Sequence, residues 1–279
     1  MIISASRRTD IPAFYTDWLI NRLNAGYCLV KNPFNPSQIK RVSLLPEDVD
    51  GIVLWTKNAA PLLPKLPQLD RFPYYFQYSI TPYHPDIEAG LADKKETVIP
   101  AFLKLAVSIG AKRMIWRYDP IIITPRYGVE YHITAFARLC ELLAGRTEKC
   151  IISFAIAYKS VAKGLAETGH MELGAEDKIR LADALMRIAK DHRITLCACC
   201  ELPGLYEPGV QPVSCVDASL FNVTVPRDKN QRDGCNCAVS VDIGAYNSCM
   251  NGCRYCYANH SESKVRKHYA EHSACSELL

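Results

Sequence analysis

Short apolar runs separated by polar turns divide the chain into a series of expected strands. These runs occupy residues 2–6, 27–31, 51–55, 74–80, 113–117, 150–155, 194–200 and 238–243. A continuous apolar run such as 150–155 is typical of a strand that is buried on both faces of a sheet. The last run, 238–243, instead alternates between apolar and polar residues.

Apolar residues at helical spacing lie between most of these expected strands. Phe14, Trp18, Leu19 and Leu23 form one such stripe, and Gly26 ends it. Further helices are expected at 98–109, 129–143 and about 176–190, whereas 202–234 is rich in turn residues and is expected to be irregular. Strand and helix thus alternate, and this alternation predicts a parallel sheet with crossover helices.

The alternation favours an α/β fold, with a TIM-type (β/α) barrel as first choice and a doubly wound open sheet as second. We expect one domain over residues 1–279, because no linker, internal repeat or low-complexity tract interrupts the chain. Active sites of such barrels lie at the carboxyl ends of the strands. At these positions the candidate catalytic residues are Arg7, Asp10, Lys57, Arg117 and Asp119. The alternative is that they form ordinary salt bridges at the barrel mouth.

Composition adds a cysteine-rich C-terminal half to this picture. The formal net charge of +4 permits an anionic ligand but lacks the strongly basic character of a dedicated nucleic-acid binder. No stretch is apolar enough for a membrane span and no signal peptide is visible, so we expect a cytoplasmic protein. In that reducing compartment thirteen cysteines indicate metal binding or redox chemistry rather than disulfides.

Cys249, Cys253 and Cys256 lie in one tight loop just after the last expected strand. Thiolates bind zinc or iron–sulfur clusters, but only Cys253 and Cys256 have the Cys-x2-Cys spacing of a zinc knuckle. Three cysteines in one loop favour a [4Fe–4S] cluster, whose fourth iron stays open for a substrate, a cofactor or a more distant cysteine. The alternative is a buried or zinc-stapled turn.

The spacing Cys-x3-Cys-x2-Cys, with an aromatic residue before the last cysteine and Tyr-Ala after it, resembles the cluster loop of radical S-adenosylmethionine (SAM) enzymes. The sequence Cys-Arg-Tyr-Cys-Tyr-Ala at 253–258 is most similar to the spore photoproduct lyase branch. The resemblance implies that Cys249, Cys253 and Cys256 hold a [4Fe–4S] cluster and that Tyr255 lies near the adenine of SAM. It also implies a cellular electron donor, and cleavage of SAM to a 5′-deoxyadenosyl radical.

The whole chain resembles a second family, the domain of unknown function 1848 family, through Ser-Ala-Ser-Arg-Arg-Thr-Asp-Ile-Pro at 4–12 and the cysteine-rich C-terminus. This resemblance implies no established activity. Radical SAM enzymes carry the cysteine loop after their first strand, whereas here it follows the last. A circularly permuted barrel accounts for this order: residues 239–243 act as the first strand, residues 2–6 as the second, and segment 235–258 closes the barrel. A Gly-Gly-Glu-like element for the methionine end of SAM is not found.

Cys235 and Cys237 leave three alternatives open. They can complete the cluster as its fourth ligand, act as redox or hydrogen-donor thiols, or form a second metal site. Their candidate partners in a second site are Cys197, Cys199, Cys200 and Cys215.

The sequence thus predicts an iron–sulfur enzyme with radical SAM chemistry on a small-molecule or nucleic-acid-derived substrate. In that enzyme Arg7, Asp10, Lys57, Arg117 and Asp119 orient the substrate or the SAM carboxylate. The alternatives are a binding module stapled by zinc, for example for nucleic acid, and a cluster-bearing electron carrier or redox sensor.

Overall fold

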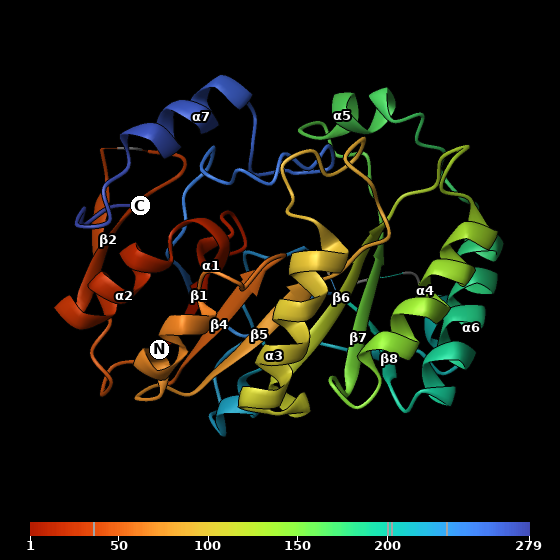
Figure 1. Ribbon diagram of the computed structural model, residues 1–279, viewed down its shortest axis with the longest axis horizontal. Coiled ribbons are helices and arrows are strands. Elements are labelled where there is room, and N and C mark those ends of the chain that lie inside the picture. Colours follow the sequence, from red (N-terminus) through yellow and green to blue (C-terminus); the bar gives the residue numbers. More distant parts are fainter. Residues whose placement is uncertain (36, 200, 202, 233) are drawn as a thin grey trace.

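A computed structural model describes residues 1–35, 37–199, 201, 203–232 and 234–279. Its centre is an eight-stranded sheet with the order β10-β1-β4-β5-β6-β7-β8-β9, in which neighbouring strands run parallel. In Figure 1, helices α3, α4 and α6 lie along the outer side of this sheet, and α7 lies at one end of the molecule.

The strands of the main sheet are short. In sheet order they are β10 (Val241–Asp242), β1 (Ile2–Ala5), β4 (Gly51–Thr56), β5 (Tyr74–Ser79), β6 (Met114–Ile121), β7 (Lys149–Phe154), β8 (Thr195–Ala198) and β9 (Gln211–Pro212). The helices are α1 (Ile11–Phe14), α2 (Thr16–Ala25), α3 (Ile99–Ile109), α4 (Val129–Leu143), α5 (Ala162–Glu167), α6 (Ala175–Asp191) and α7 (Glu262–Glu271). Two further strands, β2 (Tyr27–Lys31) and β3 (Ile39–Ser43), form a separate antiparallel pair.

The sheet confirms the predicted α/β class and the predicted position of the last strand. Ile3 pairs with Val241 and Ser4 pairs with Asp242, so β10 lies beside β1 as a permuted order requires. The remaining strands follow in chain order. In the described part of the chain no pairing joins the outer strands β9 and β10, so a closed TIM barrel is not found.

Several elements differ from the sequence prediction. Residues 27–31 form a strand, but it pairs with β3 and does not belong to the main sheet. Strand β3 was not predicted, because its residues are mostly exposed and carry no apolar pattern. Strand β9 lies where irregular structure was expected: its two residues are exposed, and only their pairing with β8 identifies them. The predicted strand at 238–243 contracts to Val241–Asp242.

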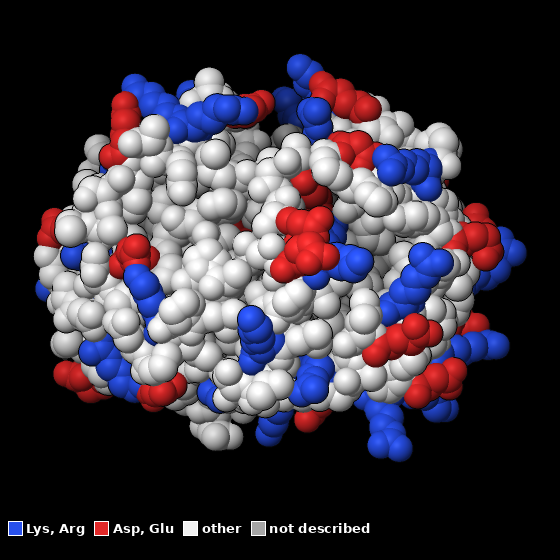
Figure 2. All heavy atoms as spheres, viewed as in Figure 1, with Lys and Arg blue, Asp and Glu red and all other residues white. Residues whose placement is uncertain are grey.

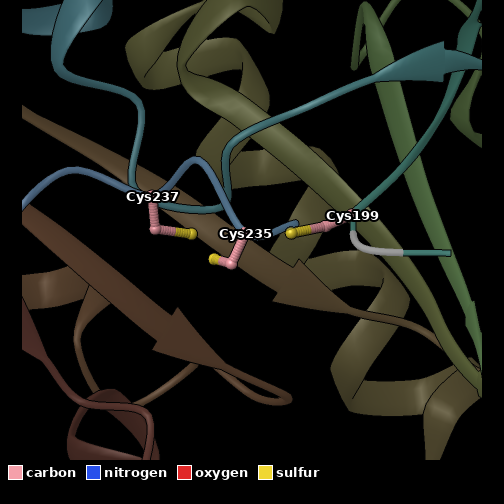
Figure 3. Close-up of side chains that lie close together, drawn as sticks. All are labelled: Cys199, Cys235 and Cys237. Atoms are coloured by element: carbon pink, nitrogen blue, oxygen red, sulfur yellow. The ribbon is translucent and has the colours of Figure 1, made fainter. Parts of the chain in front are cut away.

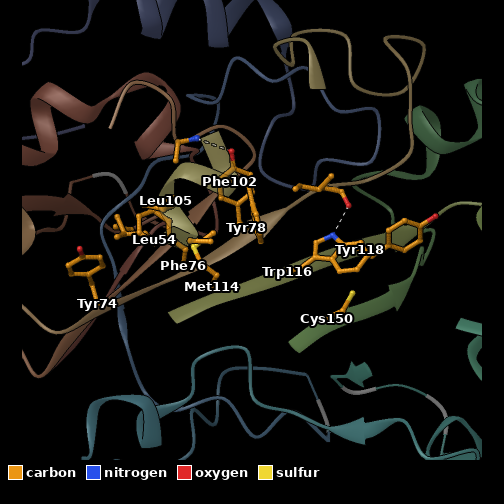
Figure 4. Close-up of a cluster of buried hydrophobic side chains, with 14 of the residues drawn as sticks. Leu54, Tyr74, Phe76, Tyr78, Phe102, Leu105, Met114, Trp116, Tyr118 and Cys150 are labelled. Carbon is orange, nitrogen blue, oxygen red and sulfur yellow. Dashed lines mark hydrogen bonds between the residues drawn. The ribbon is translucent and has the colours of Figure 1, made fainter. Parts of the chain in front are cut away.

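The two faces of the main sheet bury different parts of the chain, because alternate residues of a strand point to opposite faces. On the outer face Leu54, Phe76 and Trp116 pack with Phe102 and Leu105 of α3 (Figure 4). The inner face bears Val53, Tyr75, Ile115, Ile151 and Cys197.

Residues 213–232 and 234–238, here called the covering segment, pack on this inner face. Val216, Phe221, Cys235 and Cys237 of this segment belong to one buried cluster with the inner-face residues. The covering segment, most of which was expected to be irregular, therefore supplies almost half of the buried residues in the second core, its cysteines included.

Candidate metal centres

The sulfur atoms of Cys199, Cys235 and Cys237 all lie within 4.8 Å of one another, and all three residues are buried. Figure 3 shows the three thiols converging from two separate stretches of chain. Cys199 follows β8 directly, and Cys235 and Cys237 belong to the covering segment. Among the described residues, these three cysteines are the group of metal-binding side chains whose ligand atoms lie this close together. Such a group can hold a metal ion.

The two-residue period of extended chain explains how these cysteines meet. Cys197 and Cys199 lie two residues apart at β8, so both face the inner side of the sheet. Cys235 and Cys237 flank the exposed Asn236 and are themselves 4% and 2% exposed, so they too point in one direction. Cys-x-Cys spacing therefore suits an extended segment that delivers two thiols to one point.

A fourth cysteine, Cys215, adjoins the group. Its thiol is hydrogen-bonded to the thiols of Cys199 and Cys237. Its carbonyl oxygen accepts hydrogen bonds from Tyr75 Oη at 2.9 Å and from Gln77 Nε2 at 2.7 Å. Side chains of the sheet thus fix the backbone position of Cys215.

The hydrogen bonds among these thiols shift two pKa values in opposite directions. Hydrogen bonds with Cys215 and Cys237 raise the pKa of Cys199. Hydrogen bonds from Cys199 and Cys215 lower the pKa of Cys237. The group therefore favours a thiolate at Cys237, and the thiolate is the form of cysteine that binds metals.

Arg117 and Asp119 lie beside Cys215. Arg117 donates from Nε to Asp119 Oδ1 at 3.1 Å and forms a second contact through Nη2. Its Nη1 donates to Cys215 Sγ at 3.2 Å and to Gln77 Oε1 at 3.1 Å. The guanidinium group also lies over the ring of Trp55, 5.2 Å from the ring centroid. Arg117 thus links the buried thiols to the inner face of the sheet.

The loop that carries Cys249, Cys253 and Cys256 is held by the chain that follows β5. Arg254 N donates to Ile87 O and Gly90 N donates to Asn251 O, both at 2.9 Å. A Cβ atom on Gly90 would lie 2.1 Å from the carbonyl oxygen of Met250, so this close approach requires glycine.

The three loop thiols are near enough to act on one another electrostatically. Burial raises the pKa of Cys253, and the charges of Cys256 and Cys249 raise it further. Cys249 is buried, whereas Cys253 and Cys256 are half-buried. In the described part of the chain their sulfurs do not form a group within 4.8 Å, so they are spaced more widely than Cys199, Cys235 and Cys237.

A buried charge network lies beside the loop, with Glu88 at its centre. Glu88 is 2% exposed, pairs with Lys57 at 2.8 Å and with Lys94, and accepts a hydrogen bond from the hydroxyl of Tyr255. Burial alone would raise the pKa of Glu88, but the two lysines lower it to about 2. The Nζ atom of Lys57 also lies 5.4 Å from the ring centroid of Tyr255, and its charge acts on Cys253.

Asp10 ties the ends of two strands to the cysteine loop. Its carboxylate caps α1 through Ala13 N, and it accepts from Thr56 Oγ1 at 2.6 Å and Lys57 N at 2.7 Å. It also accepts from Asn251 Nδ2 of the loop at 2.9 Å. Burial raises the pKa of Asp10. These contacts make Asp10 a positioning residue in this structure.

The fold divides the predicted site residues between two neighbouring places. Asp10, Lys57 and Tyr255 join the cysteine loop, whereas Arg117 and Asp119 join Cys215. The guanidinium of Arg7 lies over Trp55, 5.3 Å from the centroid of the ring that Arg117 also approaches. The charge of Asp119 still raises the pKa of Lys57, so the two places are electrostatic neighbours.

The cysteines that the sequence left open are now mostly placed. Cys235 and Cys237 lie with Cys199, not with the loop cysteines. Cys197 points to the same inner face, but its sulfur is outside the close group. The prediction that involved Cys200 falls outside the described residues.

Sequence reasoning missed several residues of these sites, namely Trp55, Glu88, Lys94 and Asn251. The rule that sites lie at strand carboxyl ends points to Trp55, near the end of β4. Glu88 and Lys94 lie in the long connection after β5, where no periodic pattern marks them. Their importance depends on contacts that only the folded chain creates.

Fold and sites together define an α/β protein with a buried cysteine group able to hold a metal. Residues 2–258 match the family described as Domain of unknown function (DUF1848), so the chain belongs to this family. No curated protein matches the sequence significantly. Among the described helices none has the length and apolar character needed to cross a membrane. On the face seen in Figure 2, Lys and Arg side chains are interspersed with Asp and Glu.

Proposed function

We propose that the protein is an iron–sulfur enzyme of the radical SAM type, with a [4Fe–4S] cluster held by Cys249, Cys253 and Cys256. The observation that carries this proposal is the position of the cysteine loop. It follows β10, the strand that pairs in parallel with β1, and it lies among buried charged residues at the carboxyl ends of β1 and β4. Ligand sites of parallel α/β sheets lie at this edge.

The three thiols fit such a cluster better than they fit a single ion. One tetrahedral zinc ion with Zn–S bonds of about 2.3 Å brings its sulfurs to about 3.8 Å from one another. The loop sulfurs are spaced more widely, and in a cluster each thiolate binds a different iron. Cys253 and Cys256 are half-buried, so both thiols are partly accessible from outside the loop.

The strand order supports a permuted, barrel-like sheet for this enzyme. Strand β10 takes the first position, and β1 and the later strands follow in the order of a (β/α) barrel. The covering segment packs on the inner face, where a closed barrel would have its interior. Residues 1–279 then act as one domain in which segment 235–258 brings the metal ligands to the barrel mouth.

When bound, the cluster supplies the single electron, received from a cellular donor, with which SAM is cleaved into methionine and a 5′-deoxyadenosyl radical. Lys57 places a buried positive charge beside Cys253, which offsets part of the rise in the pKa of this thiol that burial causes. Glu88 fixes the hydroxyl of Tyr255 and thereby the position of its ring, which the resemblance puts near the adenine.

Arg7 is the residue that we assign to an anionic group of the ligand. Its guanidinium rests on Trp55, and among the described residues it forms no ion pair. A planar guanidinium suits a carboxylate, which it binds through two parallel hydrogen bonds. The carboxylate of SAM or of the substrate is such a group.

Anaerobic reconstitution with iron and sulfide tests the proposal. We expect about four iron and four sulfide per chain, and formation of 5′-deoxyadenosine from SAM after reduction. Cys256→Ala should lose the cluster, whereas the control Cys275→Ala removes an exposed cysteine and should keep it. Absence of iron and sulfide from the wild-type protein would refute the proposal.

The same experiment separates the alternatives. A cluster that is reduced reversibly but yields no 5′-deoxyadenosine would indicate an electron carrier or redox sensor. Zinc at the loop without sulfide would indicate a zinc-stapled binding module. The mixed charges on the face in Figure 2 give no support to a nucleic-acid surface there, because such surfaces collect Lys and Arg.

A further inference from the structure

We propose that Cys199, Cys215, Cys235 and Cys237 bind one zinc ion at a second centre, separate from the cysteine loop. We further propose that this ion fastens the covering segment to the end of β8. The two parts of the proposal rest on the packing of these four residues and on the place of each in the chain.

The spacing of the sulfurs suits a single ion. Cys199, Cys235 and Cys237 have sulfurs within 4.8 Å of one another, close to the roughly 3.8 Å that tetrahedral zinc with Zn–S bonds of about 2.3 Å requires. A [4Fe–4S] cluster would separate them further, because each thiolate binds a different iron. Four soft thiolates in tetrahedral array are a zinc ligand set, and structural zinc sites of this kind have no open position.

Cys215 is proposed as the fourth ligand because, among the described residues, its thiol lies next to the group, although its sulfur is outside the set within 4.8 Å and must move closer to bind the ion. It is hydrogen-bonded to both Cys199 and Cys237, and it is 9% exposed. Its backbone is already fixed by Tyr75 and Gln77, so little ordering is needed to bring its thiolate to the ion. Cys197, on the same face of the sheet, instead directs its thiol toward the carbonyl oxygen of Thr195 at 3.7 Å.

The surroundings supply hydrogen-bond donors to such a centre, although Arg117 is itself paired with Asp119. Zinc with four thiolates carries a net charge of −2, and a buried charge needs hydrogen-bonded counter-charges. Arg117 Nη1 donates to Cys215 Sγ at 3.2 Å, and Arg232 Nη2 donates to the carbonyl oxygen of Cys199 at 2.7 Å. Donors placed around the ligands in this way orient them and tune the affinity for the metal.

The ion would join two stretches of chain that have little regular structure between them. From Cys199 to Cys237, the described residues contain two 3₁₀ turns and the two-residue strand β9. The covering segment also contacts Arg117 through Cys215, and Asp119, the ion-pair partner of Arg117, acts electrostatically on Lys57 beside the cysteine loop. The zinc centre would thus hold Cys215, and through it Arg117, without taking part in the chemistry of the cysteine loop.

A variant that lacks the loop cysteines isolates the second centre. Cys249→Ser/Cys253→Ser/Cys256→Ser should still purify with one equivalent of zinc and no sulfide. Replacing zinc with Co²⁺ should give the visible bands of a tetrahedral thiolate site, and their charge-transfer intensity counts the thiolates. Loss of all zinc, or iron with sulfide in this variant, would overturn the proposal. Failure of the cluster proposal leaves this result unchanged, because the loop is already removed.

The fourth ligand is tested in the same background. Loss of a residue that only supports a metal ligand weakens metal binding by up to about 100-fold. If Cys215 is a ligand itself, Cys215→Ser should therefore weaken zinc binding by at least about 100-fold. Competition with a chelator measures this affinity. The matched control Cys197→Ser lies two residues before Cys199 and should bind zinc with unchanged affinity. Equal affinity in both variants would exclude Cys215. If Cys215→Ser does not fold, the Co²⁺ spectrum of the loop variant decides between three and four thiolates.

Discussion

His132 is a fully buried histidine whose two ring nitrogens both have partners. Nδ1 lies 2.9 Å from Tyr118 Oη, and Nε2 lies 3.1 Å from the carbonyl oxygen of Ile122. A carbonyl oxygen only accepts, so Nε2 carries the proton and Nδ1 accepts from Tyr118. This assignment describes the neutral ring, the form that burial favours by lowering the pKa of His132 to about 4.

This pKa makes the protein sensitive to mild acid. In the unfolded chain the histidine has a pKa of about 6.5 and binds a proton below that pH, whereas the folded chain leaves His132 unprotonated. The free energy of unfolding therefore falls as the pH falls from about 6.5 to about 4. Between pH 7 and pH 5 the free energy of unfolding of the wild type should fall by about 2 kcal/mol more than that of His132→Gln. Urea unfolding at both pH values measures this, and equal losses in the two proteins would contradict it.

Glu88 is the second residue with a specific expectation. Glu88→Gln leaves the buried charges of Lys57 and Lys94 without their shared counter-ion. Loss of one member of a buried ion pair costs about 3 to 5 kcal/mol of unfolding free energy. The control Glu172→Gln breaks an exposed pair with Lys178 and should cost less than about 1 kcal/mol in the same urea titration. Similar costs for the two variants would contradict a central role for Glu88.

At the scale of elements, the cysteine loop depends on the connection after β5. Residues 87–90 hydrogen-bond to the loop backbone, and helix α5 approaches it at Gly164, where a Cβ atom would lie 2.2 Å from the carbonyl oxygen of Arg254. The loop is thus held from two sides, although neither neighbour carries a cysteine. Its shape is a property of three segments and not of its own sequence.

Gly90→Ala tests this support. The added methyl group would collide with the carbonyl oxygen of Met250, and overpacking of this kind costs about 1 to 3 kcal/mol. We also expect less iron per chain after reconstitution, because the loop must move. Gly128→Ala is the matched control, since no atom lies within 4 Å of its added Cβ. Unchanged iron content in Gly90→Ala would indicate that the loop forms its site without this contact.

At the scale of the molecule, the sheet has two cores of different character. The outer core consists of helices packed on strands, whereas the inner core depends on the covering segment. That segment has few backbone hydrogen bonds of regular structure to hold it. Its attachment therefore rests on the buried apolar cluster and, in our proposal, on zinc.

Zinc removal should consequently release one region and spare the rest. After chelation of the loop variant, limited proteolysis should cut between residues 213 and 238, and the far-ultraviolet circular dichroism should change little, because the helices lie on the outer face. Mass spectrometry of the fragments locates the cuts. Cleavage spread evenly over the chain would instead mean that the metal supports the whole fold.

Much of this architecture could be predicted from local pattern. The apolar runs of β1, β4, β5 and β7 are strong because both faces of these strands are buried. The permuted barrel order predicted that β10 lies beside β1, and the pairing of Ile3 with Val241 confirms this prediction. Strands β3 and β9 could not be found in this way, because their residues are largely exposed and only their partners make them strands.

By itself, the sequence determined the α/β class, the family and the cysteine-loop spacing, since these depend on residues that lie near one another in the chain. Tertiary structure alone decided which cysteines meet. Cys199 and Cys235 are far apart in sequence, and their sulfurs come together because the covering segment buries apolar side chains on the inner face. The same folding placed Glu88 between two lysines and moved Arg117 away from the loop to Cys215. Burial of distant apolar residues, which no local pattern encodes, is the physical reason for both outcomes.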